Sequence, residues 1–140
     1  MKVSTLKCKK RLAVLWFSGS IVLFIVLLLQ SIFGHYGNKV SDAWGWLLPN
    51  IMPTLSLIIG VLIIDGFSKK KGEKVDKFFF KLSFFLSLMY IILICLSIFI
   101  QPFTRLSSLE LLKLSNLWLG PFQGLVSASI GAFFVKSENK

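Results

Sequence analysis

Few side chains in this sequence are of the types that catalyse reactions. The 140 residues include one histidine, His35, and two cysteines, Cys8 and Cys95. A hydrolytic triad needs a histidine held between a nucleophile and a carboxylate, a zinc protease uses H-E-x-x-H, and thiol oxidation uses C-x-x-C. Neither motif occurs, and Asp42 is the acidic residue nearest to His35 along the chain. The sequence therefore predicts a protein that is not an enzyme and uses no metal or cofactor. A lipid-directed enzyme built on His35 and Asp42 is the least supported hypothesis.

A second group of polar side chains lies inside an apolar run. At 100° per residue the group falls within about 80° on one face of a helix. Its members are Ser83, Ser87, Tyr90, Ser97 and Gln101. One interpretation is a helix face buried in a bundle, with serine hydroxyls bonded to carbonyls one turn earlier. The other is the lining of a water-filled path. The first is favoured, because conducting paths usually also contain acidic or basic groups.

Membrane-spanning helices are the elements that must position these side chains. Hydrophobic residues make up 55% of the chain and the mean hydropathy is +0.78, which is more than a soluble domain of this size needs. Four apolar runs are long enough to cross a hydrocarbon core of about 30 Å: residues 12–33, 46–65, 78–100 and 117–135. The segments between them are too short to bury a core. We predict one all-α domain over residues 1–140, an up-and-down bundle of four transmembrane helices without a soluble domain.

The distribution of basic residues predicts how this bundle is oriented. The chain has 16 Lys and Arg residues against six acidic ones, a net charge of +10. Lys39, Arg105 and Lys113 lie on one side of the predicted membrane. The other side carries Lys2, Lys7, Lys9, Lys10, Arg11, Lys69, Lys70, Lys71, Lys74, Lys77, Lys81, Lys136 and Lys140. Short loops rich in Lys and Arg stay in the cytoplasm. Both termini are therefore predicted to be cytoplasmic. The preference for Lys over Arg, together with abundant Ile and Phe, is typical of an AT-rich bacterial genome, so the bundle is predicted to lie in a bacterial inner membrane.

The basic segments also predict a partner. Each basic residue near an anionic membrane surface contributes about 1 kcal/mol of attraction. The densest segment follows the second span and contains Lys69, Lys70, Lys71, Lys74 and Lys77. We expect it to contact anionic lipid headgroups or a soluble partner. Nucleic acid is not expected, because neither stacking aromatic residues nor a soluble element of groove size accompanies the charge.

Small residues define two further helix faces. Such residues at every fourth position let helix backbones approach closely in a membrane. The fourth run carries Gly120, Gly124, Ser127, Ala128, Gly131 and Ala132, and one face of the second run carries Gly45, Pro49, Pro53, Ser56 and Gly60. We expect tight helix packing at these faces. The partner of the fourth run is left open between the second span, another copy of the chain and another membrane protein.

The two prolines of the second run predict a kink. Pro49 suits the first turn of a helix, where its missing N–H leaves no bond unmade. Pro53 lies one turn deeper and removes the hydrogen bond to the Pro49 carbonyl. We expect water, Asn50 or Thr54 to satisfy that carbonyl, so that the helix kinks and continues.

Two local contacts are predicted near the membrane surfaces. Ser107 and Glu110 match a capping box, and the residues that follow recur at helical spacing. This pattern predicts a short amphipathic helix on the outer surface, between the third and fourth spans. At the cytoplasmic end of the second span, Asp65 is expected to pair with Lys69 four residues later.

These patterns favour a non-catalytic integral membrane protein that acts by self-association or by docking on a partner within the cytoplasmic membrane. Membrane effectors, immunity proteins and subunits of larger complexes can have this design. The alternative is a small channel or carrier, lined by the polar stripe of the third span and hinged at Pro49 and Pro53. Under both hypotheses the protein is a multi-pass protein of the cell membrane.

Overall fold

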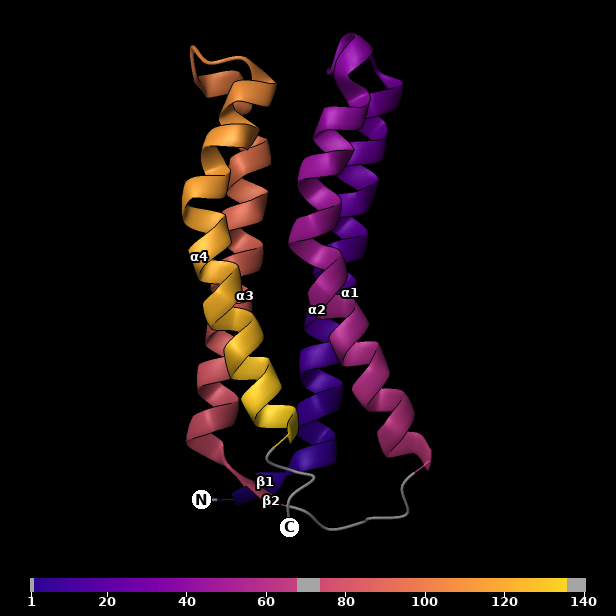
Figure 1. Ribbon diagram of the computed structural model, residues 1–140, viewed down its shortest axis with the longest axis vertical. Helices are drawn as coiled ribbons and strands as arrows, with labels where there is room; N and C mark the ends of the chain where they lie inside the picture. Colours follow the sequence, from indigo (N-terminus) through magenta and orange to yellow (C-terminus); the bar gives the residue numbers. More distant parts are fainter. Residues whose placement is uncertain (1, 68–73, 136–140) are drawn as a thin grey trace.

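Four long α-helices run side by side along the length of the protein (Figure 1). The computed structural model describes residues 2–67 and 74–135. The helices are α1 (Thr5–Ile32), α2 (Val40–Phe67), α3 (Lys77–Phe99) and α4 (Ser108–Val135). Continuous helix suits these apolar runs, because every backbone polar group inside a helix finds its partner within the same segment.

Three of the helical segments are long and apolar enough to cross a membrane. They are Thr5–Ile32, Gly37–Phe67 and Lys77–Phe99. The chain is therefore an all-helical protein suited to embedding in a bilayer. The fourth helix, α4, has 28 residues and packs against α3 and α2. Its role as a fourth span stays a prediction.

The helices form a four-membered ring of contacts. α1 packs against α2 and α3, and α4 packs against the same two helices, so α1 and α4 occupy opposite corners. α2 and α4 lie in front of α1 and α3 in the view of Figure 1. A large exposed fraction remains on side chains that point outward, such as Phe24 (41%), Phe85 (58%) and Leu125 (58%). These outward apolar side chains are suited to contact with lipid tails, where water would disfavour them.

A two-stranded ribbon joins the starts of two helices. β1 (Lys2–Ser4) pairs antiparallel with β2 (Lys74–Asp76), with Val3 opposite Val75. β1 leads directly into α1 and β2 into α3, and the Asp76 carboxylate accepts a hydrogen bond from the Phe78 amide at the start of α3. This ribbon was not predicted from the sequence. Its strands have only three residues each, too short for a periodic pattern.

Three of the helices start well before the predicted spans, at Thr5, Val40 and Ser108 and not at residues 12, 46 and 117. The capping box is confirmed: the Ser107 amide donates to Glu110 Oε2 (3.1 Å) and the Glu110 amide donates to Ser107 Oγ (3.3 Å). The predicted separate outer helix is wrong, because its residues form the first turns of α4. Leu111 and Leu112 are buried in the bundle. Burying them stabilises a helix that continues into the bundle over one lying on the membrane surface.

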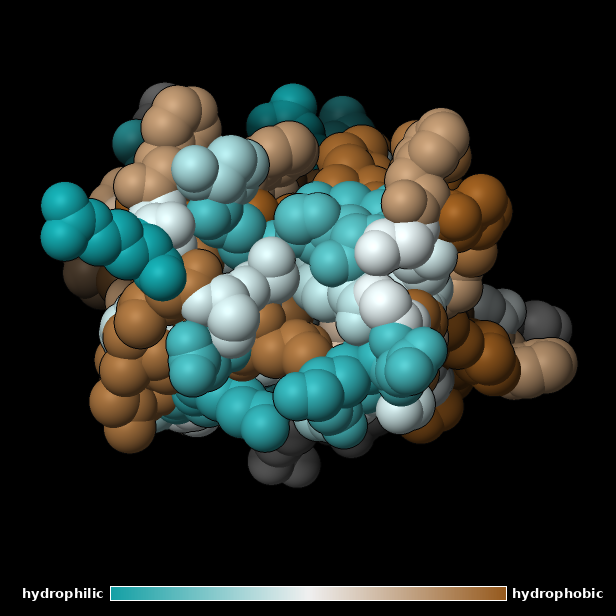
Figure 2. All heavy atoms as spheres, turned by 90° about the horizontal axis from the view of Figure 1, so that it is seen from above, coloured by the Kyte–Doolittle hydropathy of each residue, from teal (hydrophilic) through white to brown (hydrophobic). Residues whose placement is uncertain are grey.

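The core follows the axis of the bundle. Its largest fully buried side chains are Trp16, Tyr90, Leu12, Leu23, Leu27, Leu47, Ile51, Ile58, Ile94, Ile98 and Leu112. At the end opposite the ribbon, the short helices η1 (Gly37–Lys39) and η2 (Gln101–Phe103) connect the long ones. Seen from that end, polar residues cover much of the centre and the lower edge of the view, and apolar residues lie mainly to the left and right (Figure 2). The bundle is therefore apolar on its sides and polar at this end.

Candidate functional site

The polar stripe of α3 faces the inside of the bundle. Ser83, Ser87, Tyr90 and Ser97 of α3, together with Gln101 of η2, are each at most 5% exposed. Ser97 Oγ donates to the Leu93 carbonyl one turn earlier (2.9 Å), and Ser83 Oγ donates across the α3–α4 contact to the Ser129 carbonyl (3.3 Å). The stripe therefore contributes to a buried polar interior and is not exposed to lipid.

Tyr90 connects this stripe to α2. Its hydroxyl donates to the Asn50 backbone carbonyl (3.0 Å) and also lies 3.1 Å from Asn50 Oδ1. Asn50 Nδ2 in turn donates to the Trp46 carbonyl (2.7 Å), and Trp46 Nε1 donates to Ser115 Oγ on α4 (2.9 Å). Three helices are thus joined by buried hydrogen bonds at one level. Because a membrane interior offers few competing partners, such bonds fix the register between the helices.

A second polar cluster closes the end of the bundle shown in Figure 2. His35 Nε2 lies 2.9 Å from both Gln101 Oε1 and Ser108 Oγ. Gln101 Nε2 donates to the Tyr36 hydroxyl (3.4 Å), which donates to Gln30 Oε1 (2.8 Å). Burial raises the pKa of Tyr36 above its ordinary value, and the hydrogen bond from Gln101 acts in the opposite direction. This cluster joins the ends of α1, α3 and α4.

Four buried polar atoms in the part of the chain that the structure describes lack a hydrogen-bond partner. They are Trp16 Nε1, Ser20 Oγ, Thr54 Oγ1 and Ser87 Oγ. The ring centroids of Trp16 and Tyr90 are 5.9 Å apart. Thr54 and Ser87 each lie about one helical turn from the Asn50–Tyr90 pair, toward the ribbon. An unpartnered buried polar group costs about 1–3 kcal/mol of stability. The interior around Trp16, Thr54 and Ser87 is therefore the part where hydrogen-bonding groups are least often paired.

An ion pair lies near the ribbon end of the bundle. Lys9 Nζ and Asp65 Oδ2 are 2.8 Å apart, with side chains 3% and 23% exposed. The sequence predicted Lys69 as the partner of Asp65, and Lys69 lies outside the described residues. The structure places Lys9 of α1 beside this carboxylate, and the contact with Lys69 stays a prediction. The pair bridges α1 and α2, which sequence spacing along one helix does not reveal.

The small-residue faces of α2 and α4 point away from the core. At Gly45, Gly60, Gly120, Gly124 and Gly131, an added Cβ atom would have no heavy atom within 4 Å. The second span is therefore not the partner of the α4 stripe, because larger buried side chains, including Leu119, Val126 and Ile130, make its contacts inside the bundle. Every residue of the two stripes is exposed or half-buried.

The two stripes border one another. α2 and α4 are in contact, and Gln123 Nε2 donates to the Pro49 carbonyl (2.9 Å). Gln123 is the neighbour of Gly124, and Pro49 belongs to the α2 stripe. We define the α2–α4 face by the exposed and half-buried stripe residues Gly45, Pro49, Pro53, Ser56, Gly60, Gly120, Gly124, Ser127, Ala128, Gly131 and Ala132.

The Gln123 bond also changes the account of the prolines. Both prolines lie inside the continuous helix α2. The Pro49 carbonyl that Pro53 leaves without an amide is satisfied by Gln123 of α4, and not by Asn50 or Thr54 as predicted. Asn50 instead bonds the Trp46 carbonyl and Tyr90, while the Thr54 hydroxyl has no partner.

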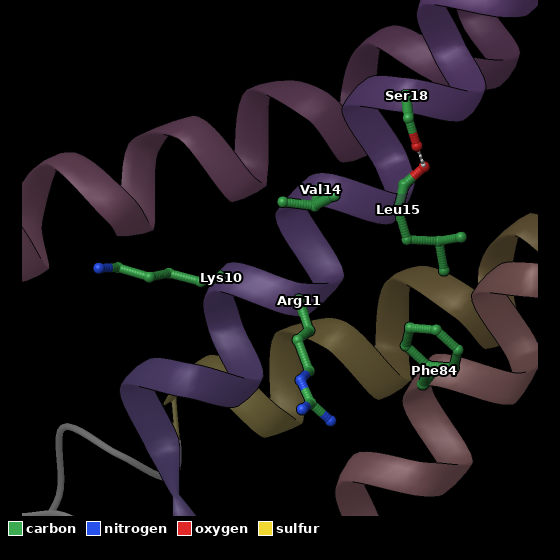
Figure 3. A pocket seen from close by; sticks show the side chains of 6 residues that line it. All are labelled: Lys10, Arg11, Val14, Leu15, Ser18 and Phe84. Carbon is green, nitrogen blue, oxygen red and sulfur yellow. Dashed lines mark hydrogen bonds between the residues drawn. The ribbon is translucent and has the colours of Figure 1, made fainter.

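A groove of about 440 Å³ opens near the start of α1. Lys10, Arg11, Val14, Leu15 and Ser18 of α1 line it, together with Phe84 of α3 (Figure 3). Ser18 Oγ donates to the Leu15 carbonyl (3.1 Å), so its hydroxyl needs no further partner. The groove is therefore cationic at one end and apolar along its length.

The basic segment after α2 falls only partly within the structure. Lys69, Lys70 and Lys71 lie outside the described residues. Lys74 is exposed in β2, and Lys77 is the first residue of α3. Among the described residues, no group of three or more His, Cys, Asp and Glu side chains is arranged to hold a metal ion.

Comparisons with protein-family models, with curated proteins and with solved structures find no match to this chain.

Sequence reasoning did not anticipate three of these features: the Lys9–Asp65 pair, the Gln123–Pro49 bond and the groove beside Arg11. Each one joins residues from different helices. The one available signal was composition, because a lysine and an aspartate flanking apolar runs are candidates for pairing.

Proposed function

We propose that the protein is a non-catalytic integral membrane protein that crosses the bilayer four times and self-associates through the α2–α4 face. The observation that supports this proposal is the outward placement of two small-residue stripes on neighbouring helices. A glycine with open space outside it allows a second backbone to approach closely, which favours helix association in lipid.

The geometry of the stripes explains why a second chain is the proposed partner. Inside this chain, the larger residues Leu119, Val126 and Ile130 of α4 provide the core packing. The glycines add nothing to that packing, and glycine is a poor helix former compared with alanine. A surface of small residues on two adjacent helices lets the same surface of a second copy approach closely, and a symmetric dimer is built from two copies of one surface.

The proposed orientation places the ribbon and both chain termini in the cytoplasm of a bacterial cell. The described basic residues of β1, the first turns of α1, β2 and the start of α3 lie at the ribbon end of the bundle (Figure 1). Short segments rich in Lys and Arg favour the cytoplasmic side. In this orientation Lys74, Lys77 and the neighbouring lysines contact anionic headgroups.

Self-association is tested by counting photobleaching steps of a fluorescent tag fused to the chain, reconstituted in dilute liposomes. We expect wild-type particles with two or more steps and Gly124→Leu particles with one. The fold should survive this change, because nothing lies within 4 Å of a Cβ atom at Gly124. Val22→Phe is the matched control, since it adds bulk to a side chain that is 54% exposed on α1. Single-step wild-type particles, or a Gly124→Leu protein that still associates, would reject the proposal.

A channel or carrier is the second candidate function. It is favoured by the buried polar interior that runs along the α3 stripe and by the unpartnered Ser87 hydroxyl within it. We expect ion flux into liposomes to be abolished by Ser87→Leu and kept by Ser87→Ala, which removes the hydroxyl without adding bulk. Wild-type liposomes without flux would exclude this candidate.

A further inference from the structure

The groove beside α1 is built where two helices are held together at two levels. At the ribbon, β1 and β2 tie the starts of α1 and α3. Further along, α1 and α3 approach closely at Gly19, where an added Cβ atom would lie 3.0 Å from Ile91 Cγ2. Leu15, Ser18 and Phe84 lie between these two levels. The groove is therefore part of the packing of α1 on α3.

The lining of the groove changes character along α1. Lys10 and Arg11 come first, and Val14, Leu15 and Ser18 follow over the next two turns, about 12 Å of helix in all. Figure 3 shows Lys10 and Arg11 leaving α1 in different directions, with Leu15 on the side of Phe84. Two cations thus flank the end nearest the ribbon, and an apolar strip continues toward the middle of the helix.

The groove opens on an outward surface of the bundle. Val14 is 67% exposed, and Lys10, Arg11 and Ser18 are exposed as well. In a bilayer, this surface meets lipid and the cations lie at the depth of the headgroups. The volume of about 440 Å³ far exceeds that of one water molecule or a small ion. A suitable occupant carries negative charge at one end and a hydrocarbon chain at the other.

We propose that this groove binds one anionic phospholipid. Its phosphate pairs with Arg11 and is also attracted by Lys10, which extends away from Arg11 (Figure 3), and the first part of an acyl chain follows Val14, Leu15 and Phe84. Guanidinium groups pair with phosphate through two parallel hydrogen bonds, which favours Arg11 as the main contact. This inference depends on the protein being embedded in a membrane, and it does not depend on the proposed self-association.

Native mass spectrometry of the full chain released from vesicles of phosphatidylglycerol and phosphatidylcholine in equal amounts tests the proposal. We expect one phosphatidylglycerol to be retained by the wild type. Lys10→Gln/Arg11→Gln should weaken its retention on the order of 100-fold, the effect of losing the two parallel charge-assisted hydrogen bonds from Arg11 to phosphate. The matched control is Lys2→Gln/Lys74→Gln, which removes the same charge from two exposed residues of the ribbon. Equal losses in both double variants would show a general surface attraction and reject a discrete site.

A second variant tests the groove without changing charge. Val14→Trp fills the apolar strip and should displace the lipid, whereas Val22→Trp, at an exposed position of α1 that does not line the groove, should not. Phosphatidylglycerol retained by Val14→Trp, or equal retention of phosphatidylcholine by the wild type, would overturn the proposal. If inorganic phosphate at the same concentration displaced phosphatidylglycerol, Lys10 and Arg11 would be binding a free anion. That result would also overturn the proposal. Because these measurements count lipids per chain, they succeed or fail independently of the photobleaching result.

Discussion

Lys9 has a charged side chain that is only 3% exposed, in a helix otherwise suited to a membrane. A buried ammonium group is stabilised when a carboxylate lies beside it, and breaking such a pair by removing one partner costs about 3–5 kcal/mol. Asp65 supplies that carboxylate from α2, at 2.8 Å. The two members are not equivalent, because the Asp65 side chain is 23% exposed and reaches water more easily.

This difference predicts an order of stabilities. Asp65→Asn should lower the free energy of unfolding by about 3 kcal/mol, because Lys9 stays buried without its carboxylate. Lys9→Met should cost less, and Lys9→Met/Asp65→Asn should be more stable than Asp65→Asn alone. Reversible unfolding in mixed micelles measures all three. A Lys9→Met protein less stable than Asp65→Asn would contradict the order.

Tyr36 predicts a dependence on alkaline pH. Burial raises the pKa of its hydroxyl above the ordinary value of about 10. The folded state then holds the proton more tightly than the unfolded state. The stabilisation is fully present below pH 10 and is lost as the pH rises through the raised pKa. When the pH is raised from neutral to above 10, the stability of Tyr36→Phe should fall less than that of the wild type. Thermal unfolding of both proteins at each pH measures this difference. Parallel pH profiles would contradict the prediction.

At the scale of the element, α2 tolerates two prolines because a neighbouring helix completes its hydrogen bonds. Pro53 has no N–H for the Pro49 carbonyl, and Gln123 Nε2 of α4 donates to it instead. Asn50 and Tyr90 make the other polar contacts at this level. The part of α2 that contains the two prolines is therefore stabilised by the tertiary structure and not by its own sequence.

This interpretation predicts a non-additive pair of substitutions. Gln123→Leu leaves the Pro49 carbonyl without a partner and should cost about 1–3 kcal/mol. In a Pro53→Ala background the restored amide bonds that carbonyl within α2, so Gln123→Leu should cost clearly less. The same unfolding experiment in micelles gives both values. Equal costs in the two backgrounds would show that the Gln123 bond does not substitute for the missing amide.

At the scale of the whole molecule, the ring of four helices sets which parts share a membrane surface. α1 and α3 start at the ribbon end, and α2 and α4 finish there (Figure 1). Lys39 of η1 and Lys113 in the first turns of α4 lie toward the other end. If α4 crosses the membrane, the chain has both termini on the side of the ribbon.

Labelling from outside the cell tests this topology. A membrane-impermeant maleimide should label Lys113→Cys in intact cells and label Lys2→Cys only after the cells are opened. An appended C-terminal tag should be protected in intact cells, because α4 returns the chain to the cytoplasm. A C-terminal tag on the same side as Lys113 would show three spans, with α4 outside the hydrocarbon core. The unmodified protein controls for labelling of Cys8 and Cys95.

Physical chemistry explains which parts of this structure were predictable from the sequence. Long apolar runs predict helices, because a helix in a membrane makes all its backbone hydrogen bonds within one segment of the chain. The capping box at Ser107 and Glu110 is equally local, and it was found correctly. The ribbon of residues 2–4 with 74–76 was missed, since three-residue strands leave no period to detect. The contact between Asp65 and Lys9 was not predicted, because sequence spacing reveals only contacts within a helix.

The sequence by itself determined that this protein is helical and suited to a bilayer, and which residues share each helix face. It also determined the excess of basic residues near one set of helix ends. Only the tertiary structure decided that the polar stripe of α3 points inward, that the small stripes of α2 and α4 point outward, and that Gln123 bonds the Pro49 carbonyl. The physical reason is that a helix face is fixed by periodicity along one chain segment. Its neighbour depends on how four segments pack, and the large buried side chains, Trp16 and Tyr90 among them, determine that packing.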